Sequence, residues 1–117
     1  MTMPWLLRDD RVLASLEIAS SRSDRRKGLL GRDGFEGALL IEGTRSVHTM
    51  GMRFPIDVAH LDDEGTVLRC ATMPRHRLGL PVPRARKVLE AEAGSFERWG
   101  ICPGQVLEVR VEHPTTP

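Results

Sequence analysis

Short runs in which apolar and polar residues alternate recur along this chain, and glycine or proline separates them. Alternation with a period of two is the pattern of a β-strand that buries one face. The pattern predicts strands in the segments RVLASLEIA, GALLIEG, HTMGMRFPIDVAHL, TVLRCATM, VLEAEA and QVLEVRVEH, which occupy residues 11–19, 37–43, 48–61, 66–73, 88–93 and 105–113.

Three segments break the alternation and connect these strands. In SRSDRRKGLLGR, Ser23 can cap a short helix that begins at Asp24, and the glycines that follow keep it short. DDEG is expected to form a turn, and SFERWGICPG a single helical turn that closes at Gly100. Six or so short strands with one short helix near residues 23–30 predict a mainly β fold, either a single-domain sandwich or an open barrel.

The whole chain, residues 1–117, is expected to form one domain. A chain of this length buries about two thirds of its unfolded surface in a single core. The family-like core described below is expected to span about residues 10–112. The closing PTTP is expected to be a short frayed tail.

Composition and charge exclude several classes of protein. A net charge of +1 with 28% charged residues gives no overall attraction to nucleic acid or to a membrane. No run approaches the roughly 18 apolar residues of a membrane-spanning helix, and Asp9 and Asp10 come too early for a signal peptide. Cys70 and Cys102 lack metal-site spacing and are expected to be free thiols. We therefore expect a cytoplasmic protein with no membrane partner.

The segment HTMGMRFPID, residues 48–57, gathers residue types that occur in ligand sites. A helix is disfavoured there, because Gly51 and Pro55 are both costly in a helix interior. A strand would instead bury one row of side chains, with the polar residues on the other face. That row would consist of His48, Met50, Met52, Phe54, Ile56 and Val58.

One imidazole and two thioethers in this segment suit a soft ion such as Cu(I). On a flat strand, side chains four residues apart have Cβ atoms about 13 Å apart, so His48 and Met52 cannot reach the same ion. The sequence therefore predicts no metal and no cofactor, and it places His48 at the edge of the core.

Asp57 is expected in the middle of this strand, on the face opposite the apolar row. Two roles stay open for it. As a structural residue, it would be solvated or paired with a cation on another strand. As a functional residue, it would line a cleft beside Arg25, Arg32 or Arg45.

Five segments stand in an order that resembles one protein family. RRKGLLGR is similar to an Arg-x-x-Gly-Leu-(Met/Leu)-x-Arg motif, and KVLEAEAG to a Val-Leu-Glu-x-x-x-Gly motif, which place Arg25, Arg32 and Glu90. ALLIE, VHTMGMRFPIDVAHLDDEGTV and GICPGQVL are similar to an apolar strand, a central block and a closing turn of the same family. That family is the domain of unknown function 192 (DUF192) family of small bacterial and archaeal proteins, and the resemblance covers about residues 10–110.

The resemblance implies a mainly β, sandwich-like fold, and it leaves the activity unassigned. The main departure lies at residues 48–52, where many relatives have Trp-Met-Lys-Asn-Thr. This chain has His-Thr-Met-Gly-Met there. The departure indicates a subgroup built around His-Thr-x-Gly-Met.

The function expected first is that of a small binding module with a polar cleft. Its ligand would be a small molecule, anionic or hydroxylated. In the alternative, the same side chains form a structural network of ion pairs. The candidate ligand-binding residues are Arg25, Arg32, His48, Asp57 and Glu90.

Two further functions stay open. A small acid–base enzyme could use His48 with Asp57 or Glu90. No nucleophile motif or phosphate loop is present, so the sequence does not decide whether the protein is an enzyme.

The segment PRHRLGLPVPRARK, residues 74–87, has no acidic residue and could dock an acidic partner. Nucleic acid is disfavoured, because no aromatic residues interleave with the arginines. The sequence does not indicate which oligomeric state the protein has.

Overall fold

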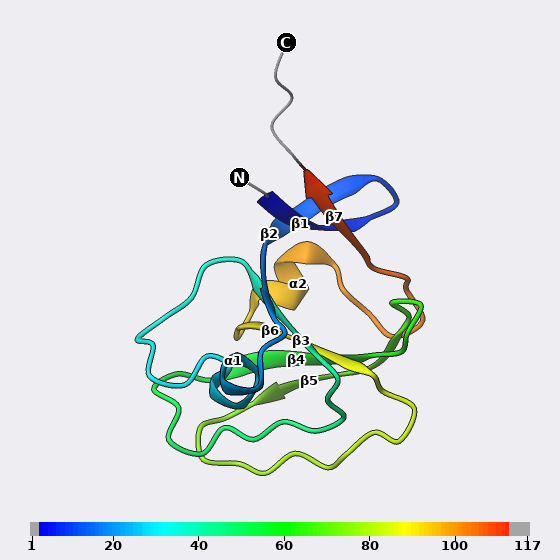
Figure 1. Cartoon of the computed structure of the whole chain (residues 1–117). Coiled ribbons are helices and arrows are strands. Elements are labelled where there is room, and N and C mark those ends of the chain that lie inside the picture. Colours follow the sequence, from blue (N-terminus) through cyan, green and yellow to red (C-terminus); the bar gives the residue numbers. More distant parts are fainter. Residues whose placement is uncertain (1–2, 113–117) are drawn as a thin grey trace.

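The computed structural model describes residues 3–112. Within them, seven strands form one sheet in the order β5-β4-β6-β3-β2-β1-β7, and the sheet does not close into a barrel (Figure 1). The helices are α1 (Arg22–Lys27) and α2 (Ser95–Trp99). The strands are β1 (Met3–Arg8), β2 (Arg11–Ala19), β3 (Ala38–Glu42), β4 (Ile56–Leu61), β5 (Val67–Met73), β6 (Lys87–Glu92) and β7 (Glu108–Glu112). The mainly β fold expected from the sequence is confirmed.

Neighbouring strands are antiparallel except for one pair, β2 with β3, which is parallel. The hairpin of β4 and β5 turns at the DDEG segment, where the Gly65 N–H donates to the Asp62 carbonyl at 3.1 Å. Parallel neighbours need a long crossover between them. Residues 20–37 provide this crossover and carry α1.

The central strands β3, β4 and β6 are almost entirely buried, so a hydrophobic cluster forms on each side of the sheet. The first cluster, which we call the α2 face, includes Leu6, Leu16, Leu40, Ala59, Leu61, Leu89, Ala91, Phe96, Ile101 and Leu107. The second, which we call the α1 face, includes Leu29, Leu39, Ile41, Val47, Met52, Phe54, Ile56, Val58 and Val88. Because side chains alternate along a strand, a one-residue step on β4 or β6 moves from one face to the other.

Glycines end the helices as the sequence predicts, but the predicted cap of α1 is wrong. The Asp24 N–H donates to the Ser21 hydroxyl at 3.1 Å, so Ser21 rather than Ser23 caps this helix. The helix therefore begins at Arg22 and ends at Gly28. The second helix ends at Gly100, as expected.

The strand predicted for residues 48–61 is wrong in its first part, because β4 begins only at Ile56. Residues 49–52 form a turn around Gly51, whose φ is 78°. The Thr49 hydroxyl donates to the Pro74 carbonyl at 2.6 Å and accepts from the Arg77 N–H at 2.8 Å. These bonds to a distant segment hold the turn closed.

The turn changes which members of the predicted apolar row are buried. Met52 and Phe54 are buried on the α1 face, as expected. Met50 is 46% exposed and His48 is also exposed, contrary to the strand prediction. The parity argument therefore applies only from Met52 onward.

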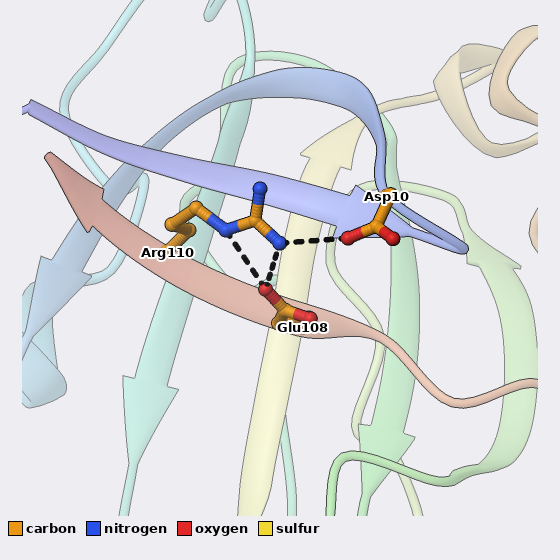
Figure 2. Close-up of polar contacts among 3 residues, drawn as sticks. All are labelled: Asp10, Glu108 and Arg110. Atoms are coloured by element: carbon orange, nitrogen blue, oxygen red, sulfur yellow. Dashed lines mark hydrogen bonds and ion pairs between the residues drawn. The ribbon is translucent and has the colours of Figure 1, made fainter.

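The sequence did not predict β1, because MPWLLR has no alternation. This strand pairs with both β2 and β7, which lie beside it at the top of Figure 1. Figure 2 shows an ion-pair network at this end, in which Arg110 donates to Glu108 at 2.6 Å and to Asp10 at 2.9 Å. These side chains are largely exposed, so strand pairing dominates the attachment of β7.

Cys70 and Cys102 are free thiols, as expected. No helix within residues 3–112 is both long and apolar enough to cross a membrane. The predicted tail at residues 114–117 lies outside the described residues.

Candidate functional site

A cavity of about 70 Å³ lies on the α1 face, where α1, the segment 44–52 and β6 meet. Basic and small residues of α1 form one wall, and His48, Met50 and Met52 form another. Glu90 of β6 also lines the cavity. The cavity thus combines three of the predicted site residues, which are Arg25, His48 and Glu90.

Glu90 reaches this cavity because of its register in the sheet. It lies opposite Leu39 of β3 and Val58 of β4, both members of the α1 face. The residue is 5% exposed, and no hydrogen bond or charge within residues 3–112 contributes to the shift of its pKa, which burial alone causes. Burial raises the pKa of Glu90 to about 7. The group can therefore exchange a proton near neutral pH.

Gly28 allows α1 to approach this carboxylate closely. A Cβ atom at this position would lie 3.3 Å from Glu90 Oε1 and 3.6 Å from Ile41 Cδ1. The φ of Gly28 is 52°, which disfavours other residues. The glycine that ends the helix therefore also shapes the cavity wall.

Arg25 is half-buried, and its Nε is buried without a hydrogen-bond partner among the described residues. Its Nη1 donates to the Glu42 carbonyl at 3.3 Å. The guanidinium is thus held at one end of β3 with a donor still unused. An unused buried donor is costly unless a ligand or water satisfies it.

His48 belongs to the turn that closes the cavity on its other side. Its Nδ1 accepts a hydrogen bond from the Met50 N–H at 3.2 Å. The Nδ1 of His76 accepts in the same way from the Gly51 N–H at 3.2 Å. Both imidazoles brace the turn through Nδ1, which leaves Nε2 as the atom available to a ligand.

Arg32 is not part of this cavity. It pairs with Glu17 through two hydrogen bonds of 3.0 and 3.2 Å, and its guanidinium lies 4.9 Å from the centre of the Phe35 ring. The hydrogen bonds to Glu17 raise the pKa of Arg32. Arg32 thus forms an ion pair, but with Glu17 rather than with Asp57 or Glu90, the partners in the structural alternative that the sequence left open.

Asp57 lies on the α2 face, away from the cavity, so the five candidate residues do not converge on one cleft. Its Oδ2 accepts from the N–H groups of Gly94 and Phe96 at 2.9 and 3.0 Å, and its Oδ1 from the Thr72 hydroxyl at 2.7 Å. The helix α2 has no capping side chain of its own. Asp57, on β4, therefore acts as the N-terminal cap of α2. Because its carboxylate is occupied by these hydrogen bonds, its role is structural.

The sequence reasoning missed several residues of the cavity. It treated Gly28 only as a helix end and Met52 only as core, and it did not single out Lys27. The spacing between Arg25 and Gly28 on one helical turn is the signal that could have indicated a shared wall. No group of three or more His, Cys, Asp or Glu side chains suited to a metal occurs in the described part of the chain.

The comparisons with known proteins support the fold. The model of the DUF192 family, described as "Uncharacterized ACR", matches residues 6–109. A structure from Sinorhizobium meliloti 1021, described as a candidate transcription regulator, is similar with a TM-score of 0.77 and 24% identity, over 93% of this chain and 94% of that chain.

A protein of unknown function from Novosphingobium aromaticivorans DSM 12444 is similar with a TM-score of 0.74 and 21% identity, over 91% of this chain and 83% of that one. At these identities, the two structures establish the shared fold alone. No curated protein matches the chain.

Proposed function

This chain belongs to the DUF192 family of uncharacterised proteins, and we propose that it is a binding module for a small anionic or hydroxylated molecule. The ligand would occupy the cavity between α1, the segment 44–52 and β6. The single observation that carries the proposal is a pair of polar groups that line one cavity. The Arg25 Nε is buried without a partner among the described residues, and the Glu90 carboxylate belongs to a residue that is only 5% exposed, with burial as the sole cause of its raised pKa.

The chemistry of these two groups describes the ligand. Arg25 offers an unused donor, while Arg26 and Lys27 add positive charge at the same wall. An anionic group would suit this wall. A hydroxyl would suit Glu90, which accepts a hydrogen bond when ionised and donates one when protonated.

The volume limits how much of a ligand can enter. A cavity of about 70 Å³ has room for about two waters, at about 30 Å³ each. Pockets for drug-sized molecules are several times larger, about 300–1,000 Å³. The ligand is therefore a compound of few non-hydrogen atoms, or one that inserts only its polar end.

The test is a titration of the ¹⁵N-labelled protein with small hydroxy acids, sugar acids and inorganic phosphate. We expect saturable shifts of the Arg25, Gly28 and His48 amides with at least one of these probes. The variants Glu90→Gln and Arg25→Gln change the contacts directly, and the latter should weaken binding about tenfold or more. Arg32→Gln is the matched control, because Arg32 pairs with Glu17 elsewhere.

The pH dependence adds a second readout. Ionised Glu90 repels a bound anion, so anion affinity should fall as pH rises through about 7, the pKa of this group. Glu90→Gln should bind anions with no such step. Equal binding by wild type, Arg25→Gln and Arg32→Gln, or shifts confined to another surface, would contradict the proposal.

A second candidate function is acid–base catalysis. It is favoured by one observation, since the pKa of Glu90 lies near neutral pH and His48 lines the same cavity. Turnover of a bound hydroxy acid that disappears in Glu90→Gln, while binding persists, would select this function. A cytoplasmic location stays a prediction, and a fluorescent fusion imaged in cells tests it.

A further inference from the structure

A second feature, independent of the cavity, lies in the segment 75–82. Leu78 and Leu80 are 79% and 74% exposed, the largest exposures among the exposed large apolar residues of the described chain. They stand two residues apart in an extended segment, so their side chains lean to the same side. Two neighbouring solvent-exposed leucines indicate a surface that binds an apolar partner.

This segment is held in place rather than loose. The Gly79 N–H donates to the Val47 carbonyl at 2.8 Å, and the Thr49 N–H donates to the Arg77 carbonyl at 2.8 Å. Farther along, the Val82 N–H donates to the Arg45 carbonyl at 3.0 Å. The segments 45–49 and 77–82 thus form a short antiparallel ribbon, which lies at the lower end of the sheet in Figure 1.

The outer edge of this ribbon is unpaired. In an antiparallel pair, alternate residues turn their N–H and C=O groups toward the partner and away from it. The Arg77 carbonyl and the Gly79 N–H bond to the other strand of the ribbon, while the backbone groups of Leu78 and Leu80 have no hydrogen-bond partner within residues 3–112. Such an edge is a template for another strand.

The charge around the edge is of one sign. Between Gly65 and Leu89 the chain has six basic residues and no acidic one. The ion pairs found within residues 3–112 include none from this stretch, and the guanidinium groups of Arg77 and Arg86 donate only to carbonyls of their own segment. The positive charge is therefore left for a partner.

We propose that the outer edge of residues 77–80 binds an extended acidic peptide segment of another protein by adding it as a third strand of the ribbon. Backbone hydrogen bonds to Leu78 and Leu80 give the pairing, and apolar side chains of the peptide cover the two leucines. Aspartate or glutamate between those apolar residues meets Arg75, Arg77 and Arg84.

Other partners fit these observations less well. A nucleic acid would use the arginines but would gain little from two leucines, and residues 74–87 include no Phe, Trp or Tyr for base stacking. A lipid surface would accept the leucines and the charge, but it cannot use an unpaired backbone edge. The peptide alone uses the leucines, the arginines and the backbone together.

The experiment measures fluorescence anisotropy of labelled octapeptides with the full chain. The probe alternates glutamate with valine, and a second peptide has the same composition in two blocks. A third alternates as the first does but carries N-methyl groups on every second amide, which removes the backbone donors on one edge. We expect saturable binding of the first peptide, and binding weaker by about tenfold or more for the other two.

Hydrogen exchange gives a direct reading of the strand pairing. The Leu78 and Leu80 amides should gain protection when the alternating peptide is bound, because they enter new hydrogen bonds. The double variant Leu78→Ser/Leu80→Ser should lose about tenfold in affinity or more. Its matched control is Val12→Ser, which removes an exposed apolar residue from the β1–β2 hairpin.

Each alternative outcome overturns the proposal. Equal affinity for the N-methylated peptide would mean that side-chain contacts bind the peptide without strand pairing. Tighter binding to anionic phosphatidylserine vesicles or to duplex DNA than to the peptide would assign the surface to those partners. A dissociation constant above about 1 mM for every peptide would show that this edge does not bind acidic peptides.

Discussion

Asp57 and Glu90 are buried carboxylates on two neighbouring strands, yet their surroundings are opposite. In the register of β4 and β6, Asp57 lies opposite Ala91 and Glu90 lies opposite Val58, so the two side chains leave the sheet on different faces. Asp57 is 3% exposed and accepts three hydrogen bonds. Glu90 is 5% exposed, and burial without donors raises its pKa to about 7.

This difference separates the structural role of Asp57 from the ligand-binding role that we propose for Glu90. A buried carboxylate that is fully hydrogen-bonded fixes the elements that donate to it. A buried carboxylate without donors lowers the stability of the fold and stays available to a ligand. The number of hydrogen bonds, rather than the depth of burial, distinguishes the two residues.

The largest expected effect comes from Asp57→Ala. This change leaves the Gly94 and Phe96 N–H groups and the Thr72 hydroxyl without their acceptor. We expect the free energy of unfolding to fall by about 3–5 kcal/mol, measured by urea denaturation. Thr72→Val, which removes one of the three bonds, should cost about 1 kcal/mol. A loss smaller than about 1 kcal/mol for Asp57→Ala would contradict the structural role of Asp57.

The next effect has the opposite sign and belongs to Glu90. Because its pKa is raised from 4.5 to about 7, the folded chain holds more protons than the unfolded chain between these values. Stability should therefore be greatest below pH 4.5 as far as Glu90 contributes, and should fall as pH rises to about 7. Urea denaturation of Glu90→Gln at pH 8 should show a gain of about 3 kcal/mol over wild type. A loss of stability in this variant would show that the carboxylate has a partner after all.

His60 offers a smaller effect on the α1 face. It lies on the same side of β4 as Val58, is 6% exposed, and neither ring nitrogen has a partner among the described residues. Burial, with the charge of Arg69 as a lesser cause, lowers its pKa. The folded state therefore binds fewer protons than the unfolded state near pH 6.5, and stability should fall as pH drops through that value.

Replacing His60 with leucine should remove this acid sensitivity. Since two unsatisfied polar atoms disappear, the free energy of unfolding should rise by about 1–2 kcal/mol at pH 7. Thermal unfolding at pH 5 and pH 8 would measure both effects. An unchanged pH dependence would mean that another group causes the acid sensitivity.

Arg32→Ala should have the smallest effect. Its ion pair with Glu17 is partly exposed, with the two side chains 35% and 52% exposed, and such pairs contribute about 0–1 kcal/mol. Ligand affinity at the Glu90 cavity should not change, as measured by the same amide shifts. A loss of binding without a loss of stability would extend the site toward Arg32.

The sequence pattern predicted much of the sheet, because alternation and glycine are local signals. It identified β2 with its observed bounds and the β4–β5 hairpin, and it expected a short helix near residues 23–30, where α1 lies at Arg22–Lys27. It failed for residues 48–55, where the bonds of Thr49 to Pro74 and Arg77 decide the conformation. Those partners lie more than twenty residues away, and no local pattern contains them.

The candidate site was predictable only in part, for the same reason. Strand parity placed Asp57 and Glu90 on their strands, but it did not show that α2 donates to one and that nothing donates to the other. Arg25 and His48 joined Glu90 through the crossover and the turn, which are set by tertiary contacts. Arg32 could not be told apart from Arg25, since both are arginines in one short segment.

The single parallel strand pair has a consequence for how this family can vary. An antiparallel β2 and β3 could be joined by a tight hairpin, and the α1 face would then lie bare beside β6. The parallel arrangement obliges the chain to travel back over that face, and the returning stretch carries Arg25 and Gly28 to Glu90. A change in the length of a hairpin loop leaves the strand order and the cavity in place. A deletion in residues 20–37, in contrast, would shorten the crossover and remove a wall of the cavity.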